Sequence, residues 1–311
     1  MSTLRAPVRV SRDDLPDRVT IWEVGARDGL QNESSVVDTA TKVELVDRLA
    51  AAGLPVVEAT SFVRPDRVPQ LADAPEVMAG ITRVPGVRYP VLVPNDRGLD
   101  AALAAGVTEI AVFASATDSF AQRNLGRPMT EQMAMFTPVV ARAREHGLPV
   151  RGYVSMCFGD PWEGAVDPAQ VIGVCTELLA SGCTWLSLGD TIGVATPGQV
   201  RSLVDGLVRS GVALDSIGVH FHDTYGQALS NTLAALESGV TTVDSSAGGL
   251  GGCPFAESAT GNLATEDLVW MLDGLGVETG VDLGALVATS VWMGERLGRA
   301  PVSRVVQALG R

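Results

Sequence analysis

Residues 150–222 read VRGYVSMCFGDPWEGAVDPAQVIGVCTELLASGCTWLSLGDTIGVATPGQVRSLVDGLVRSGVALDSIGVHFH. Three short runs in this stretch are rich in β-branched and apolar residues and have the length of buried strands: 150–156, 185–189 and 217–222. The two segments between them, 168–181 and 197–210, have the apolar spacing of amphipathic helices. Strands that alternate with helices and are apolar along most of their length indicate parallel strands joined by helical crossovers.

The same alternation runs along the whole chain. We expect strands at 19–25, 56–60, 89–93, 109–115, 150–156, 185–189, 217–222 and 241–246. We expect helices at 39–52, 75–83, 97–105, 130–146, 168–181, 197–210, 227–238 and 262–275. Glycine, the usual residue at the end of a helix, follows many of these patterns: Gly53, Gly106, Gly147, Gly182, Gly211, Gly239 and Gly276.

Eight strand–helix units are the number that closes a TIM barrel, so the sequence predicts an α/β fold of the (β/α)8 type. No linker or low-complexity tract interrupts the 311 residues, which are therefore expected to form a single domain. The barrel is expected at about 19–276, with additional C-terminal helices at about 280–311. A doubly wound open sheet is the rival arrangement, because it also alternates strands and helices.

Composition and charge restrict the partners. The chain has 36 acidic and 23 basic side chains and a formal net charge of -13, which argues against a general surface for nucleic acid. No apolar run approaches the ~18 residues of a membrane span, and the N-terminal segment lacks the apolar region of a signal peptide. The cysteines, Cys157, Cys175, Cys183 and Cys253, form no C-x-x-C pair. We therefore expect a cytoplasmic protein that binds neither nucleic acid nor membrane.

Charged residues stand where the first two strands end, which is where TIM-barrel enzymes carry their active sites. Arg27 and Asp28 follow the first expected strand, and Glu58 lies inside the apolar run 56–60. Arg27 and Asp28 alone are equally consistent with a surface ion pair. A buried Glu58 needs a partner, however, and Arg27 on the neighbouring strand is the natural one. Together, Arg27, Asp28 and Glu58 favour a functional site over a surface ion pair.

Two of the chain's three histidines lie two residues apart on one expected strand. His220 and His222 should face the same side, into the barrel, with Phe221 directed at the helices. A single inward histidine is more often a hydrogen-bonded core residue. Two on one face, with Asp28 across the barrel mouth, predict a metal site that keeps further positions open to water or substrate.

A glycine-rich segment, GGLGGCP at 248–254, follows the last expected strand. It lacks the G-K-[ST] ending of a phosphate-binding P-loop. An isolated cysteine is often an inert buried residue, but Cys253, among glycines at the active end of a barrel, is interpreted as a reactive thiol. Asn262 is equally consistent with a helix N-cap, a metal ligand or both. Tyr153 and Asp190, near two strand ends, complete the candidates, and Tyr153 alone would also fit the core.

Six motifs together resemble one enzyme family. In chain order they read VGARDGLQNE, VVEATSFV, RGYVS, SLGDTIGVATPGQ, HFHDTYGQALSNTL and GGLGGCPFAESATGNLATED. Their order and spacing, from about Val19 to about Asp282, are similar to those of the 3-hydroxy-3-methylglutaryl-CoA lyases, which are metal-dependent TIM-barrel enzymes. The R-D-G and H-x-H pieces are shared with isopropylmalate and homocitrate synthases. The glycine-rich cysteine loop joined to ATGNLATED is more specific to the lyases.

The resemblance implies an activity and a role for each candidate. The reaction is cleavage of 3-hydroxy-3-methylglutaryl-CoA to acetyl-CoA and acetoacetate, and the cofactor is a divalent metal, Mg2+ or Mn2+. The implied metal ligands are Asp28, His220, His222 and Asn262. The implied catalytic residues are Arg27, Asp28, Glu58, His220 and Cys253. The implied substrate-binding residues are Gln31, Tyr153, Asp190 and Glu266.

These roles agree with the chemistry of carbon–carbon cleavage. The metal would lower the pKa of the tertiary hydroxyl, and Asp28 or His220 would remove its proton. Arg27 would stabilise the thioester enolate, and Cys253 would protonate it as a general acid.

Several alternatives stay open from the sequence. The substrate is a small acyl-CoA, and a related 3-hydroxy-acyl-CoA is the alternative to the one named. A Claisen-condensing synthase, a 2-His-1-carboxylate iron oxygenase and a non-catalytic binding barrel are the rival functions. We expect a homodimer or a higher homo-oligomer.

Overall fold

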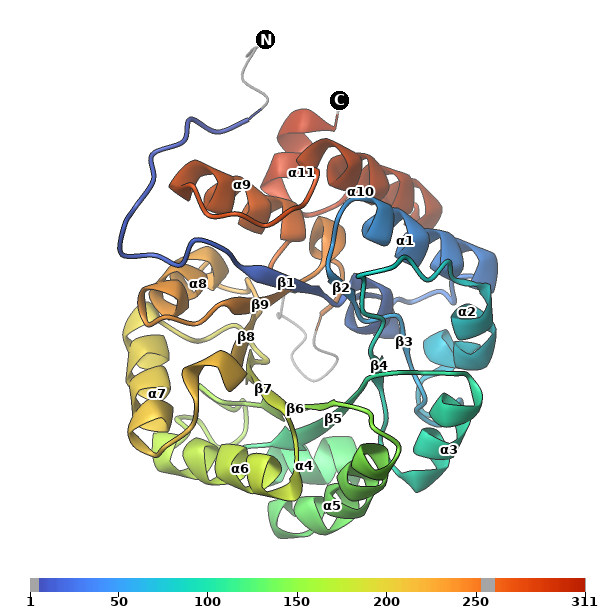
Figure 1. The fold of residues 1–311 in the computed structure, drawn as a ribbon, viewed down its shortest axis with the longest axis vertical. Helices are drawn as coiled ribbons and strands as arrows, with labels where there is room; N and C mark the ends of the chain where they lie inside the picture. The colour runs from blue at the N-terminus through green and yellow to red at the C-terminus, as the bar shows by residue number, and fades with distance from the viewer. Residues whose placement is uncertain (1–5, 253–260, 311) are drawn as a thin grey trace.

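Parallel strands form a closed ring inside a ring of helices (Figure 1). The computed structural model describes residues 6–252 and 261–310. Its strands are β1 (Thr20–Glu23), β2 (Val56–Val57), β3 (Thr60–Ser61), β4 (Val91–Leu92), β5 (Ile110–Ser115), β6 (Val150–Ser155), β7 (Trp185–Asp190), β8 (Ile217–Phe221) and β9 (Thr242–Ser245). The sheet runs β2-β1-β9-β8-β7-β6-β5-β4-β3, and these neighbours pair in parallel.

The ring closes because β2 and β3 are two halves of one strand. Glu58, at the break, donates its backbone N–H to Glu23 on the β1 side at 2.8 Å. Ala59 donates to Pro90 on the β4 side at 3.0 Å. The strand thus changes partner at the break without losing backbone hydrogen bonds, and it continues to Ser61. The expected (β/α)8 barrel is confirmed, and the open sheet is excluded.

The helices fall where the sequence pattern placed them, with one addition. They are α1 (Thr39–Ala51), α2 (Ala74–Gly80), α3 (Asp96–Ala104), α4 (Asp118–Leu125), α5 (Met129–Glu145), α6 (Pro168–Ser181), α7 (Pro197–Arg209), α8 (Ala228–Glu237), α9 (Thr265–Leu275), α10 (Leu283–Leu297) and α11 (Arg304–Leu309). The expected helix-ending glycines all have positive φ. The addition is α4, a short helix whose pattern was missed because it buries only Phe120 and Ala121.

One expected helix start is wrong. The pattern 262–275 made Asn262 a candidate N-cap, but α9 begins at Thr265 and its N-cap is Ala264. The Asn262 side chain donates instead to Leu250 and to Asp28. Asn262 is therefore not the N-cap of α9, and its interpretation as a metal ligand remains a prediction.

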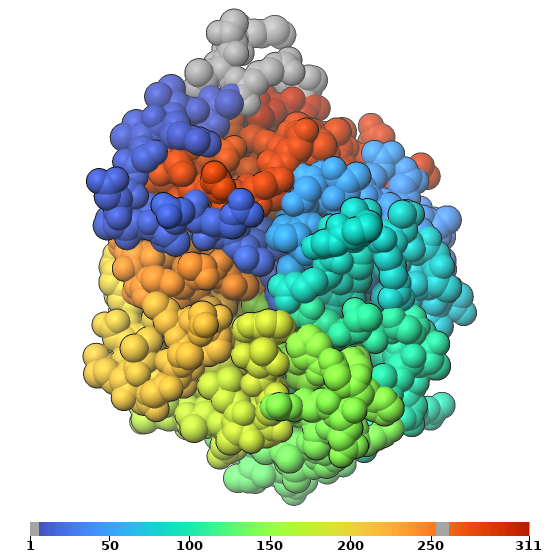
Figure 2. Space-filling view, in the orientation of Figure 1, coloured from blue at the N-terminus to red at the C-terminus, as the bar shows by residue number. Residues whose placement is uncertain are grey.

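The C-terminal helices complete the outer ring. In Figure 1, α9, α10 and α11 lie between α8 and α1. The guanidinium of Arg48 on α1 stacks on the ring of Trp292 on α10, 4.5 Å from its centre. The N-terminal segment crosses the outside of this region, and Arg12 binds Glu237 of α8 at 3.0 Å. In Figure 2 the dark blue atoms of this segment lie beside the orange and red ones, and atoms close the centre of the ring.

Among the helices of the described ranges, none is both long and apolar enough to cross a bilayer. Three of the cysteines, Cys157, Cys175 and Cys183, are buried free thiols.

Candidate active site at the barrel rim

A tight turn after β1 presents Arg27 and Asp28 at the barrel mouth. Residues Gly25–Gly29 form a single π-helical turn, in which the N–H of Gly29 binds the carbonyl of Val24 at 3.1 Å. A Cβ at position 25 would lie 2.6 Å from Glu23 Oε1, and one at position 29 would lie 2.8 Å from Leu250 Cβ. Only glycine therefore allows so close a coil, which turns adjacent Arg and Asp side chains toward the barrel mouth.

Arg27 is locked in place by two carboxylates. Its Nε donates to Glu58 Oε1 and its Nη1 to Asp28 Oδ1, both at 2.7 Å. Glu58 is held in turn by Trp22 Nε1, at 3.1 Å from its Oε2, and by the hydroxyl of Tyr153. The expected pairing of Arg27 with Glu58 is confirmed. Burial alone would lower the pKa of Arg27, but the charges of Glu58 and Asp28 raise it, so the guanidinium stays charged.

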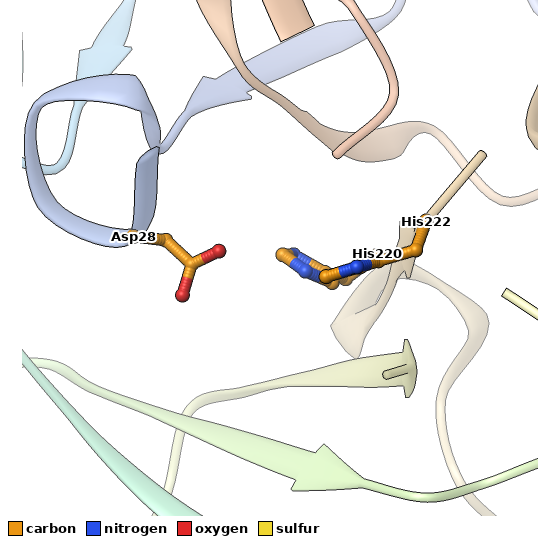
Figure 3. Close-up of side chains that lie close together, drawn as sticks. All are labelled: Asp28, His220 and His222. Carbon is orange, nitrogen blue, oxygen red and sulfur yellow. The ribbon is translucent and has the colours of Figure 1, made fainter. Parts of the chain in front are cut away.

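Asp28 faces two imidazoles across the mouth of the barrel (Figure 3). Asp28, His220 and His222 each offer one ligand atom, and these atoms lie within 4.8 Å of one another. β8 carries His220, and His222 follows it two residues later, so both rings turn to the same side as expected. Burial would raise the pKa of Asp28, but Arg27 and the two histidines lower it to about 2. The carboxylate is therefore ionised and ready to bind a cation.

Asn262 joins this group from the segment that precedes α9. A β-bridge pairs it with His222. Its Nδ2 donates to Asp28 Oδ2 at 2.8 Å and to the carbonyl of Leu250 at 3.0 Å. Its Oδ1 is buried and has no hydrogen-bond partner in the described part of the chain. An orphaned amide oxygen beside a carboxylate and two imidazoles fits a divalent metal, and the oxygen donors suit a hard ion such as Mg2+ or Mn2+.

Tyr153 adjoins the Arg27 network, and Gln31 follows the turn that carries Arg27. The ring of Tyr153 lies 5.4 Å from the guanidinium carbon of Arg27. Burial, reinforced by the Glu58 charge, holds the pKa of Tyr153 well above its usual value, so it remains a hydrogen donor. Gln31 follows the π-helical turn, and its buried Oε1 lacks a hydrogen-bond partner within residues 6–252 and 261–310. The role of Gln31 in binding substrate stays a prediction.

Asp190 and Glu266 have partners of their own. Asp190, at the end of β7, accepts from the N–H groups of Val194 at 2.9 Å and Ala195 at 3.0 Å. Glu266 accepts from the N–H of Gly248 at 2.9 Å and from the hydroxyl of Ser290. Both carboxyl groups hold local backbone, and their role in binding substrate stays a prediction.

Cys253 lies outside the described residues. The described residues on either side of its segment, Gly252 and Gly261, are both tied to loops at the barrel mouth. The carbonyl of Gly252 accepts from Asn32 Nδ2 at 2.7 Å, and that of Gly261 accepts from the N–H of Asp223 at 3.1 Å. A role for Cys253 in this site therefore remains a prediction from the sequence.

Three buried polar residues beside the cluster of Asp28, His220 and His222 were not identified from the sequence. Arg151 Nη2 donates to Asp244 Oδ1 at 2.7 Å. Asp244 Oδ2 accepts from Ser187 Oγ at 2.8 Å and lies 3.2 Å from His220 Nδ1. Burial would lower the pKa of His220, but its hydrogen bond to Asp244 and the nearby carboxylate charges raise it. The signal that identified Glu58, a charge within an apolar strand, was also present at Arg151 and Asp244.

Comparison with known proteins finds relatives over nearly the whole chain. Residues 18–293 match the sequence profile of the HMGL-like family. The chain is 50% identical over 308 residues to the mitochondrial hydroxymethylglutaryl-CoA lyase of Bos taurus, which covers 99% of this chain and 94% of that protein.

Solved structures resemble the chain in both fold and sequence. The hydroxymethylglutaryl-CoA lyase from Pseudomonas aeruginosa has a TM-score of 0.93 and 49% identity, covering 95% of this chain and 98% of that one. The HMG-CoA lyase from A. baumannii, solved in complex with coenzyme A and 3-methylmalate, has a TM-score of 0.90 and 36% identity. That match covers 96% of this chain and 97% of the other.

Proposed function

The chain belongs to the HMGL-like family, and from this membership we propose that it cleaves 3-hydroxy-3-methylglutaryl-CoA to acetyl-CoA and acetoacetate. One observation carries the proposal. A chain half identical to named lyases brings Arg27, Asp28, His220 and His222 together at the barrel mouth, from segments almost 200 residues apart. This is a cation-binding group beside a fixed guanidinium, which suits a reaction that builds up negative charge on oxygen.

Asp28, His220, His222 and Asn262 would hold a divalent metal, Mg2+ or Mn2+. A metal bound there supplies Lewis acidity, which lowers the pKa of the substrate's tertiary hydroxyl. Asp28 or His220 would accept the hydroxyl proton as the general base; for His220 this requires a free Nε2.

Arg27 stabilises the charge that appears when the carbon–carbon bond breaks. Its Nε and Nη1 bind Glu58 and Asp28, whereas its Nη2 makes no hydrogen bond to the described residues. That free edge donates to the oxygen of the thioester enolate as its charge develops. Because both carboxylates already fix the guanidinium, little reorganisation accompanies the reaction.

Cys253 returns a proton to the enolate carbon as the general acid, which gives the methyl group of acetyl-CoA. The electron pair of the broken bond ends in this new carbon–hydrogen bond. The carbon that carried the hydroxyl becomes the ketone of acetoacetate.

A coupled cleavage assay tests the proposal. Purified protein is given a panel of 3-hydroxy-acyl-CoAs, with Mg2+, with Mn2+ or with a chelator, and both acetoacetate and acetyl-CoA are measured. We expect acetoacetate and acetyl-CoA to form in equal amounts from 3-hydroxy-3-methylglutaryl-CoA, and only when Mg2+ or Mn2+ is present. Faster cleavage of another 3-hydroxy-acyl-CoA would correct the substrate, and absence of cleavage across the panel would refute the activity.

The assembly and the compartment are proposed as well. We propose a homodimer or a higher homo-oligomer in the cytoplasm, following the expectations from the sequence. Light scattering of the purified chain tests the first and cell fractionation the second. A monomer across the working concentration range, or recovery of the chain outside the cytosolic fraction, would contradict them.

A further inference from the structure

Asp244 lies directly opposite His220 on the neighbouring strand. In the parallel register of β8 and β9 the two residues are Cα partners. The carboxylate is buried, with Oδ2 at 3.2 Å from His220 Nδ1. Because Nδ1 faces Asp244, the nitrogen left to meet a metal is Nε2.

We propose that Asp244 is a positioning residue, which holds the proton of His220 on Nδ1 and so presents an unprotonated Nε2 to the metal. The inference rests on the metal site of the proposed function. A neutral imidazole carries one N–H, and the partner of one nitrogen decides which nitrogen is protonated. An ionised carboxylate only accepts hydrogen bonds, so it selects the Nδ1–H form.

Arg151 keeps that carboxylate charged and immobile. Its guanidinium is 0% exposed, donates to Asp244 Oδ1 at 2.7 Å and lies over the ring of Trp22, 4.0 Å from the ring centre. Position 218 leaves room for it, because a Cβ there would come within 2.6 Å of Arg151 Nη2. Ser187 donates to the same carboxylate from β7. Side chains from two strands, Arg151 of β6 and Ser187 of β7, therefore hold the Asp244 carboxylate beside His220.

A carboxamide at this position would reverse the tautomer. In Asp244→Asn, the buried guanidinium of Arg151 requires the amide oxygen at the Oδ1 position. The amide nitrogen then faces His220 and donates to Nδ1, which moves the histidine proton to Nε2, the metal-binding atom. The metal must then displace that proton, which weakens binding.

The first experiment determines the His220 tautomer in the wild-type protein itself. Protein labelled with 15N-histidine is studied without metal by long-range 1H–15N NMR from about pH 8 upward, to a pH at which the His220 signals no longer change, so that the tautomer is read on the neutral imidazole. The chain has only three histidines, and a His220→Ala spectrum assigns the signal. We expect the Nδ1–H tautomer for His220 in wild type and the Nε2–H tautomer in Asp244→Asn. A predominant Nε2–H tautomer in wild type would overturn the inference, whether or not the variant folds.

The second experiment measures Mn2+ affinity by the EPR signal of free Mn2+, which does not depend on activity. We expect Asp244→Asn to bind Mn2+ ~10–100-fold more weakly than wild type, the scale found for partners of metal-binding histidines. Glu109→Gln is the matched control. It breaks another Arg–carboxylate pair, with Arg88 at 3.1 Å, at the N-terminal ends of the strands, so it should bind Mn2+ as wild type does. Ser187→Ala, which leaves the carboxylate, should also keep the affinity and the tautomer.

The outcomes separate the two proposals. Wild-type Mn2+ binding that is lost in His220→Ala but unchanged in Asp244→Asn overturns the positioning role and leaves the metal site intact. Equal weakening in Asp244→Asn and Glu109→Gln assigns the effect to general destabilisation and also overturns it. Wild type that fails to bind Mn2+, or His220→Ala that binds it normally, removes the proposed metal site and this inference with it.

Discussion

At the scale of single residues, two side chains carry different steps of the proposed reaction. Arg27 is held by Glu58 and Asp28 through its Nε and Nη1, and the proposed reaction uses its Nη2 edge. Cys253 was selected from the sequence alone, as the one cysteine in a glycine-rich loop at the active end of the barrel. Each role leads to a substitution that separates chemistry from packing.

Replacing Arg27 should slow turnover much more than it weakens binding. We expect Arg27→Gln and Arg27→Lys to lower kcat by at least ~100-fold, the usual scale for removing a donor that binds transition-state charge. Lysine fails because its point charge cannot bind Glu58, Asp28 and substrate together as the planar fork does. Steady-state kinetics over substrate concentration would measure kcat and KM separately.

The matched control for this change is Arg88→Gln, which also leaves a buried glutamate, Glu109, without its arginine. It should retain kcat, because Arg88 lies at the N-terminal ends of the strands. A near-normal kcat in Arg27→Gln would reduce Arg27 to a structural partner of Glu58.

Cys253→Ser tests the proposed general acid. Serine keeps nearly the same volume, but its hydroxyl is a far weaker acid than a thiol of pKa ~8.5. Turnover should fall by ~100-fold or more, with Mn2+ affinity and Tm unchanged. An alkylating agent should inactivate wild type, with protection by substrate, whereas the serine variants of Cys157, Cys175 and Cys183 should stay active. Full activity in Cys253→Ser would exclude the thiol from the reaction.

At the scale of elements, two buried glutamates anchor the turn from which the glycine-rich loop begins. Glu23 of β1 accepts from the N–H of Ala247 at 2.9 Å and from the hydroxyl of Thr265 at 2.6 Å. Glu266 of α9 accepts from the next N–H, that of Gly248. Burial raises the pKa of Glu23 to about 7 and that of Glu266 to about 8, although their hydrogen bonds oppose the rise.

These raised pKa values make stability depend on pH with a definite sign. An unfolded glutamate releases its proton near pH ~4.3, whereas the folded protein keeps the Glu266 proton up to about pH 8. In that window the folded state binds more protons, so the free energy of unfolding falls as pH rises. Glu266→Gln cannot titrate but still accepts from Gly248, so its Tm should decline less between these pH values.

Tm measured across this pH range in both proteins checks the expectation. Glu145→Gln, at an exposed position of α5, is the control and should follow wild type. Parallel curves for Glu266→Gln and wild type would show that Glu266 is ionised throughout.

At the scale of the whole molecule, the metal group exists only in the folded barrel. Its residues come from the turn after β1, from the end of β8 and from the segment before α9. A metal that binds this group stabilises the folded state by mass action, because the unfolded chain does not assemble the site. At 100 times the Kd this stabilisation is about 2.7 kcal/mol.

We therefore expect saturating Mn2+ to raise the Tm of wild type, and the double variant His220→Ala, His222→Ala to lose that rise. Differential scanning calorimetry at several Mn2+ concentrations measures both. His146→Ala changes the remaining histidine, at the end of α5, and should respond to Mn2+ as wild type does. An equal rise in the double variant would mean that the metal binds elsewhere.

The sequence by itself determined the barrel. Eight apolar runs at strand length, separated by helical patterns that end in glycine, allow few other arrangements, because each element's period specifies which face it buries. Local signals also selected Glu58, His220 and His222, because charged or polar residues in apolar strands require partners, and they selected Arg27 as the residue that could pair with Glu58. The short α4 and the π-helical turn were not predicted, because neither has enough apolar residues to show a helical period.

Only the tertiary structure decided which of those residues share a partner. Asn262 was equally consistent with a helix cap and a metal ligand until the structure paired it with His222 after β8, where its amide oxygen has no hydrogen-bond partner among the described residues. Asp244 and Arg151 were two isolated charges in the sequence, and the register of β8 with β9 joined them to His220. Sequence periodicity reports the face on which a side chain lies, whereas a hydrogen bond depends on the relative height of two strands, which barrel closure sets.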